Sequence, residues 1–279
     1  MILGGGEDWW YPTGTAGTFP DKPAEDPAEA SKGTKGNLVD HARALGYTYA
    51  ANAQQLQQAG PGKLLGLFAN EEMFQQKPEG QGDLYSPVVD LPTMTRKALD
   101  TLGSHQQGFF LFVEEEGVDE FAHNNNGAKV LQSMAQLDAA VAVARQYLAQ
   151  HPDTLLVVTG DHECGGLTIE GIGADDETGT GESVEDGPFP IKGSNQQFVM
   201  DWTTTEHTGV PVPVTGEGPG SEAFTGQPQH LRTRRPGPCR RPLAGRKIRA
   251  APRKRWRFST DIRCSKARIT SMACPLSRS

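Results

Sequence analysis

The chain is poor in cysteine and aromatic side chains, and it lacks a long apolar run. Only four of its 279 residues are cysteines, and no two of them form a C-x-x-C pair, which argues against a disulfide framework or a cysteine zinc site. No segment approaches the roughly 20 consecutive apolar residues that a membrane-spanning helix needs. A glycine triplet follows shortly after Met1, so no secretory signal is visible. We therefore expect no membrane span, and the compartment is left open.

Acidic and basic residues are distributed unevenly along the chain. It holds 27 Lys and Arg and 34 Asp and Glu, but residues 228–279 carry 16 of the basic side chains and a single acidic one, Asp261. The preceding part is strongly acidic, which favours solubility and cation binding and argues against nucleic acid as a partner. We expect residues 227–279 to be a basic, disordered tail, and one hypothesis for its composition is a frameshift near Gln227. A genuine basic arm for nucleic acid is the alternative.

Hydrophobic periodicity divides residues 1–226 into strands and helices of an α/β domain. The apolar runs 108–113 (GFFLFV) and 154–159 (TLLVVT) indicate strands that are buried on both faces. Between them, apolar residues repeat every three to four positions over 128–150, which predicts a helix. Because strand, helix and strand follow in this order, we expect a βαβ unit with two parallel neighbouring strands. The polar, Gly-rich segment 165–197 is expected to be a surface insertion. Shorter elements are expected as well: strands at 2–3 and 64–68, and helices at 36–46 and 93–102.

Acidic residues and histidines follow both of these strands. The first strand leads to Asp119 and His123, which are four residues apart, and the second leads directly into Asp161 and His162. Ligands of open parallel sheets bind at the carboxyl ends of the strands, so these side chains are expected at one edge. Carboxylate and imidazole together are a ligand set for zinc, and also for manganese and iron. The alternative is that these residues are only solvated loop residues or helix caps.

Four segments resemble motifs of the alkaline phosphatase family. VEEEGVDEFAH at 113–123, TGDHECGG at 159–166 and WTTTEHTG at 202–209 resemble its three metal-binding motifs. ILGGG at 2–6 resembles the Gly-rich strand end that lies mid-chain in the family. The order and approximate spacing of all four agree over roughly residues 1–226. The resemblance implies a three-layer α/β sandwich with a mostly parallel central sheet, in an incomplete form.

The resemblance also implies a set of metal ligands for two zinc ions and one magnesium ion, with the second zinc site incomplete. The implied ligands are Asp119, His123 and His207 for one zinc, Asp161 and His162 for the other, and Glu114 for magnesium. Glu114 is preferred because it lies five residues before Asp119, whereas Glu115 and Glu116 are expected to be solvated. Cys164 could bind a metal on chemistry alone, but the resemblance gives it no role, and we expect a small loop residue.

The activity implied is that of a metal-dependent phosphomonoesterase acting on small phosphate monoesters. The family's nucleophilic serine lies in an Asp-Ser-Ala type motif upstream of the Gly-rich strand, and no such motif occurs here. We therefore assign no catalytic residue and expect a truncated, catalytically impaired form. The alternatives are a non-catalytic metal-binding remnant and a related phosphodiesterase or sulfatase-like hydrolase. The family is usually periplasmic or secreted, and the resemblance allows a homodimer.

Overall fold

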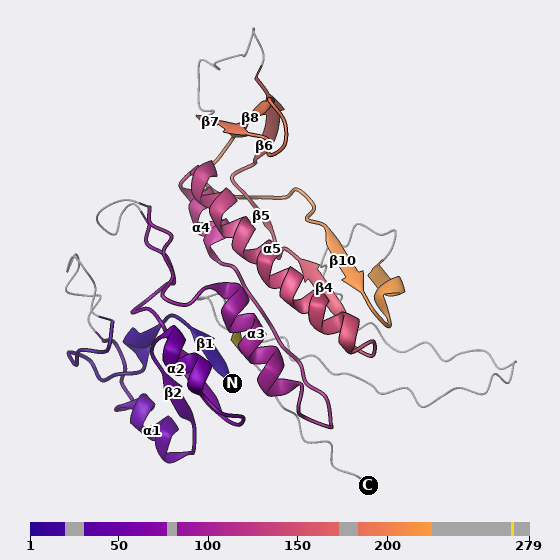
Figure 1. The fold of residues 1–279 in the computed structure, drawn as a ribbon. Helices are drawn as coiled ribbons and strands as arrows, with labels where there is room; N and C mark the ends of the chain where they lie inside the picture. Colours follow the sequence, from indigo (N-terminus) through magenta and orange to yellow (C-terminus); the bar gives the residue numbers. More distant parts are fainter. Residues whose placement is uncertain (20–30, 77–82, 173–183, 225–268, 271–279) are drawn as a thin grey trace, which may run out of the picture.

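The computed structural model describes residues 1–19, 31–76, 83–172, 184–224 and 269–270 (Figure 1). The expected basic tail 227–279 lies outside the described residues except for the short strand β11 (Ile269–Thr270). No helix in the described part of the chain combines the length and the apolar character that a membrane crossing requires.

The amino-terminal part forms a sheet with the strand order β11-β1-β3-β2. β1 (Ile2–Gly4), β3 (Leu64–Leu67) and β2 (Thr48–Ala50) are parallel, and β11 pairs with β1 in the antiparallel sense. The strands expected at 2–3 and 64–68 are therefore confirmed. The short 3-10 helix η1 (Glu7–Trp9) follows the turn after β1.

Helices cover both faces of this sheet. Leu65 and Leu67 of β3 pack with Val39 of α1 (Leu38–Ala44) on one face. On the other face, Leu3 and Leu64 join a cluster that contains residues of α2 (Ala53–Gln58) and α3 (Leu91–Leu102). Alternate side chains of a strand point to opposite faces, so the four-residue strand β3 separates two apolar layers. The result is the expected α/β sandwich around a mostly parallel sheet.

The two longest helices pack against each other and confirm the predicted helices at 93–102 and 128–150. α3 begins two residues earlier than predicted, because the Asp90 side chain accepts a hydrogen bond from the Thr93 backbone N–H and caps the helix. α5 (Gly127–Gln150) is capped by Asn126 in the same way. The short helix α4 (Gly117–His123) precedes α5 and packs against it.

The predicted strand at 154–159 is confirmed, but its predicted parallel pairing with a strand at 108–113 is wrong. β4 (Leu156–Thr159) pairs in the antiparallel sense with β10 (Val214–Glu217), and 108–113 form no named strand among the described residues. Phe110 and Phe112 are 54% and 48% exposed, whereas Leu111 and Val113 pack on the core. An apolar run indicates a strand but specifies neither its partner nor whether both faces are covered.

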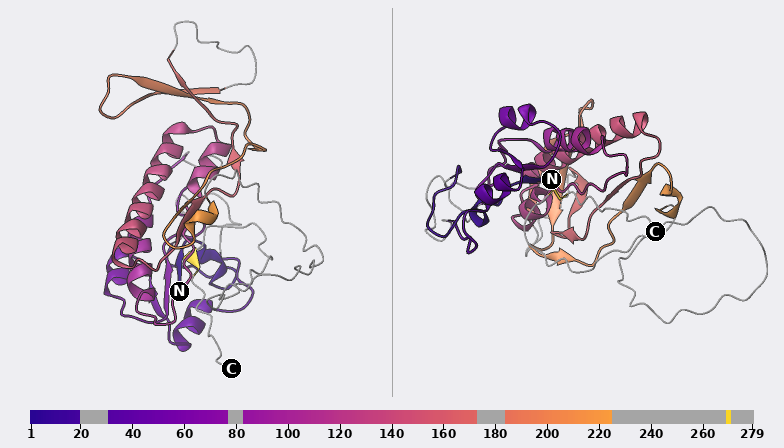
Figure 2. Two further views of the ribbon diagram at one scale, coloured as in Figure 1. Left: turned by 90° about the vertical axis from the view of Figure 1, so that its right-hand side faces the viewer. Right: turned by 90° about the horizontal axis from the view of Figure 1, so that it is seen from below.

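A second sheet with the order β6-β8-β7 lies beyond one end of α4 and α5 (Figures 1 and 2). It consists of β6 (Thr168–Gly171), β8 (Gln197–Trp202) and β7 (Val184–Pro190), all antiparallel. The segment 165–197, expected to be an insertion, thus contributes two strands, and 173–183 lie outside the described residues. Two short elements, β5 (Glu163–Cys164) and β9 (His207–Thr208), pair with each other, and the 3-10 helix η4 (Ser221–Phe224) follows β10.

Candidate metal centre

Helix α4 presents Asp119 and His123 on one face. The two residues are one helical turn apart, and Asp119 Oδ2 lies 3.5 Å from His123 Nε2. The helix is held in place by Phe121 and Ala122, which are buried in a cluster that also contains Trp202 of β8. The local sequence therefore places one polar pair outward and one apolar pair inward on the same seven-residue helix.

The short ladder between β5 and β9 brings His207 to the same place. Cys164 lies opposite His207 in this ladder, and His207 Nε2 is 3.3 Å from Asp119 Oδ1 and 3.0 Å from His123 Nε2. His123 Nδ1 donates a hydrogen bond to the carbonyl oxygen of Thr205. This bond leaves the His123 Nε2 lone pair directed at the cluster, which is the tautomer that a metal ligand needs.

His162 joins the group, but Asp161 and Glu114 do not. His162 Nδ1 lies 3.7 Å from Asp119 Oδ1, and its ring stacks on that of His207 with centroids 3.6 Å apart. The Asp161 side chain is 82% exposed and contacts His162, through the backbone N–H and through Nε2 at 3.5 Å. Glu114 is exposed as well. The structure thus brings four of the six predicted ligands together, with three histidines around Asp119. Metal binding by each of the four stays a prediction.

The chemistry of this cluster fits a divalent cation. Asp119 Oδ1 and His162 Nδ1 are both buried, and neither has a hydrogen-bond partner. Leaving a buried polar atom unsatisfied costs about 1–3 kcal/mol, and more for a charged group. A cation between these atoms would satisfy the carboxylate and the imidazole lone pairs together.

Cys164 was expected to be a loop residue without a role, whereas the structure places it in the short strand β5, beside the predicted ligands. Its Sγ belongs to a group of four potential ligand atoms, with those of Asp119, His123 and His207, that all lie within 4.8 Å of one another. Burial, and next the Asp119 carboxylate, raise the pKa of the Cys164 thiol. The available sequence signal was its i, i+2 spacing from His162, which places both side chains on one face of an extended segment.

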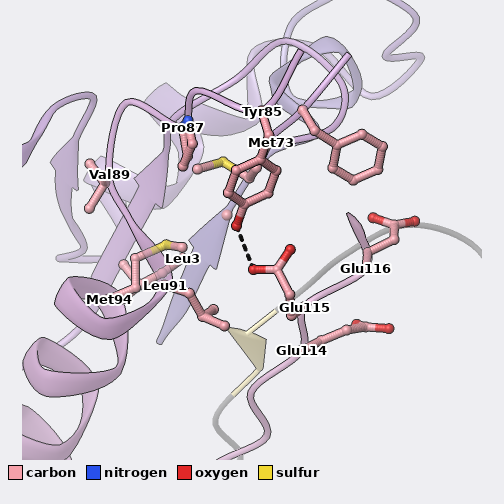
Figure 3. A pocket seen from close by; sticks show the side chains of 12 residues that line it. Leu3, Met73, Tyr85, Pro87, Val89, Leu91, Met94, Glu114, Glu115 and Glu116 are labelled. Carbon is pink, nitrogen blue, oxygen red and sulfur yellow. Dashed lines mark hydrogen bonds between the residues drawn. The ribbon is translucent and has the colours of Figure 1, made fainter. Parts of the chain in front are cut away.

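Glu115 was expected to be solvated, and this is also wrong. It lines a pocket together with Leu3 of β1 and Met94 of α3, and its carboxylate faces the Tyr85 hydroxyl (Figure 3). Tyr85 Oη donates a hydrogen bond of 2.7 Å to Glu115 Oε2. Burial raises the pKa of Glu115 from 4.5 to about 7, although the hydrogen bonds from Tyr85 and from the Gly117 backbone N–H oppose this effect.

The raised pKa of Glu115 predicts a pH-dependent stability. Because the folded protein binds this proton more tightly than the unfolded chain, the contribution is complete below about pH 4.5 and is lost as the pH rises through about 7. In chelator-treated parent protein, the free energy of unfolding should therefore fall by about 2 kcal/mol as the pH rises across this window. Glu115→Gln should not show this fall. Urea denaturation at both pH values measures it.

The matched control for this experiment is Glu170→Gln, which neutralises an exposed carboxylate on β6. That variant should keep the pH dependence of the parent chain. If Glu115→Gln and Glu170→Gln show the same difference between the two pH values, Glu115 does not titrate as described.

Comparisons with known proteins agree with this fold. The family described as alkaline phosphatase matches residues 1–189. Streptomycin-6-phosphate phosphatase of Streptomyces griseus is 30% identical over 250 residues, which cover 81% of this chain and 52% of that protein. Alkaline phosphatase 4 of Bacillus subtilis is 26% identical over 238 residues, which cover 68% and 50%. The chain thus spans about half the length of these curated relatives.

Solved structures show the same architecture. The cold-active alkaline phosphatase of a psychrophilic Shewanella species is 27% identical, with a TM-score of 0.53 over 80% of this chain and 60% of that one. The alkaline phosphatase of the Antarctic bacterium TAB5 is 22% identical, with a TM-score of 0.55 over 80% and 54%. A variant of the TAB5 enzyme has been solved with Mg bound.

Proposed function

The chain belongs to the alkaline phosphatase family, and we propose that it forms the metal-binding part of a phosphomonoesterase of this type, in a catalytically impaired form. The observation that carries the proposal is the convergence of His123, His162 and His207 on the half-buried Asp119 carboxylate. The relatives named above are phosphatases, so small phosphate monoesters are the proposed class of substrate.

The proposed ligand assignment gives one zinc ion to α4 and β9. Asp119, His123 and His207 would hold this ion, because their ligand atoms already face one another. A second zinc ion would use His162 and, after a rotation of its exposed side chain, Asp161. Magnesium would bind at Glu114. When bound, such ions polarise a phosphoryl oxygen and stabilise a leaving oxygen.

The proposed impairment rests on the serine hydroxyls in the described part of the chain, which do not contact these ligands. No serine in the described residues makes a hydrogen bond to Asp119 or to the three histidines. Phosphoryl transfer through a covalent intermediate needs a nucleophile that a base or a metal activates and that points at phosphorus. We therefore propose that the chain binds metal and phosphate but turns substrate over poorly.

Hydrolysis of a chromogenic phosphate monoester tests this proposal. The purified chain, shown to melt cooperatively, is assayed at alkaline pH with zinc and magnesium, and inorganic phosphate binding is measured by the rise in melting temperature. We expect phosphate binding that requires zinc, and a hydrolysis rate no higher than that of the Asp119→Asn variant. Zinc-dependent turnover that Asp119→Asn abolishes would show that the chain is not impaired. Failure of the folded chain to bind zinc would refute the proposed function itself.

A further inference from the structure

We propose that Cys164 is a fourth protein ligand of the ion held by Asp119, His123 and His207, so that this site is a closed, thiolate-containing one. The inference rests on the proposed metal site and adds to it a ligand outside the three expected. It also strengthens the preference of the site for zinc over magnesium and manganese.

The four ligand atoms are separated by distances similar to those around a bound zinc ion. A tetrahedral zinc ion with ligands at about 2.0–2.3 Å holds neighbouring ligand atoms about 3.5 Å apart. The four atoms here lie within 4.8 Å of one another, and His207 Nε2 is 3.0 Å from His123 Nε2 and 3.3 Å from Asp119 Oδ1. These separations lie close to those that a tetrahedral ion requires.

Regular backbone elements hold all four residues in place. Two ligands come from one turn of α4, and two come from facing positions of the β5–β9 ladder, where Cys164 is opposite His207. Facing residues in such a ladder have their Cβ atoms about 5 Å apart, which suits a shared ion. The ladder is extended by a hydrogen bond of 3.1 Å from the Gly165 N–H to the Glu206 carbonyl oxygen.

The chemistry of the four ligands determines which ions the site prefers. A thiolate with two imidazoles and one carboxylate suits zinc, cobalt or cadmium, whereas magnesium and manganese prefer oxygen ligands. Four protein ligands are typical of structural zinc sites, because catalytic sites keep a position open for water or substrate. This site would therefore stabilise the link between α4, β5 and β9, and contact with phosphate would fall to the second proposed ion, at His162 and Asp161.

An alternative role for Cys164 is that of a positioning residue, with the thiol donating a hydrogen bond to the Asp119 carboxylate. Both roles would lower metal affinity when the thiol is lost. Only direct bonding produces a thiolate-to-metal charge-transfer band, so absorption spectroscopy separates the two.

The experiment uses cobalt(II) as the probe and the full chain as the protein. The parent for the comparison carries serine in place of the cysteines outside the cluster, so that one thiol remains; the positions replaced are Cys239, Cys264 and Cys274. We expect this parent to show the near-ultraviolet charge-transfer band when cobalt is added. Adding Cys164→Ser should abolish the band and weaken zinc binding by about 10- to 100-fold.

Each outcome decides a different claim. Cobalt binding without the band in the parent would refute Cys164 as a ligand, while leaving the proposed function intact. A chain that remains folded but binds no cobalt would overturn both. Circular dichroism of the parent and of Cys164→Ser, without metal, confirms that the two proteins are folded alike, and Cys164→Ala serves as a second variant should serine disturb the ladder.

Discussion

Asp119→Asn is expected to abolish specific zinc binding while leaving the metal-free protein as stable as the parent, or more so. Asp119 contacts His123, His162 and His207, so the variant takes away the carboxylate around which the site is built. Apparent zinc-binding energies of roughly 10–16 kcal/mol over four ligands imply an affinity loss of at least about 10²-fold. Without metal, the variant removes a buried carboxylate oxygen that has no hydrogen-bond partner, so stability should not fall.

Thermal melting with chelator and with zinc measures both effects. At zinc concentrations about 100 times the dissociation constant, the parent should gain about 2.7 kcal/mol, or a rise in melting temperature of roughly 5–10 °C. Asp119→Asn should show no such rise. Asp100→Asn, at an exposed carboxylate of α3, is the matched control and should behave like the parent. A zinc-induced rise of equal size in Asp119→Asn would mean that the ion binds elsewhere.

Much of the secondary structure could be predicted because its signals are local. The periodic run at 128–150 and the helix α5 differ by one residue at the start. The helix predicted at 93–102 lacks only the first two residues of α3. The strands 108–113 and 154–159 show where local signals end. The run at 154–159 contains β4, whereas 108–113 form no named strand among the described residues. The pairing of β4 with β10 depends on residues almost 60 positions away along the chain.

The candidate site likewise contains residues that have a local sequence signal and residues that have none. The four-residue spacing of Asp119 and His123 is that of one helical turn, and the structure places both residues on α4. His207 has no local signal, because a histidine in a threonine-rich loop is usually a surface residue; only the family resemblance made it a candidate. Cys164 and Glu115 were missed because their surroundings are set by distant segments. The β5–β9 register places Cys164 beside His207, and Tyr85 closes the pocket over Glu115.

Gly165→Ala is expected to destabilise the protein by about 3 kcal/mol and to weaken zinc binding. Gly165 has φ = +85°, and a Cβ atom there would lie 2.4 Å from Cε3 of the Trp202 ring. Trp202 is fully buried and cannot move aside. Left-handed backbone costs an alanine about 1–2 kcal/mol, and overpacking adds about 1–3 kcal/mol. Because Gly165 directly follows Cys164, relief of the clash should also shift the ladder and reduce zinc affinity by about tenfold.

Gly193→Ala separates the two causes. Gly193 has a similar φ of +79°, but no atom lies within 4 Å of the Cβ that alanine would add. This variant should therefore lose only about 1–2 kcal/mol, the cost of the backbone conformation, and should bind zinc like the parent. Urea denaturation and zinc titration of both variants give the comparison. Equal losses of stability would mean that the Trp202 ring tolerates the added methyl group, and that the β5–β9 ladder is less tightly fixed against β8 than the structure indicates.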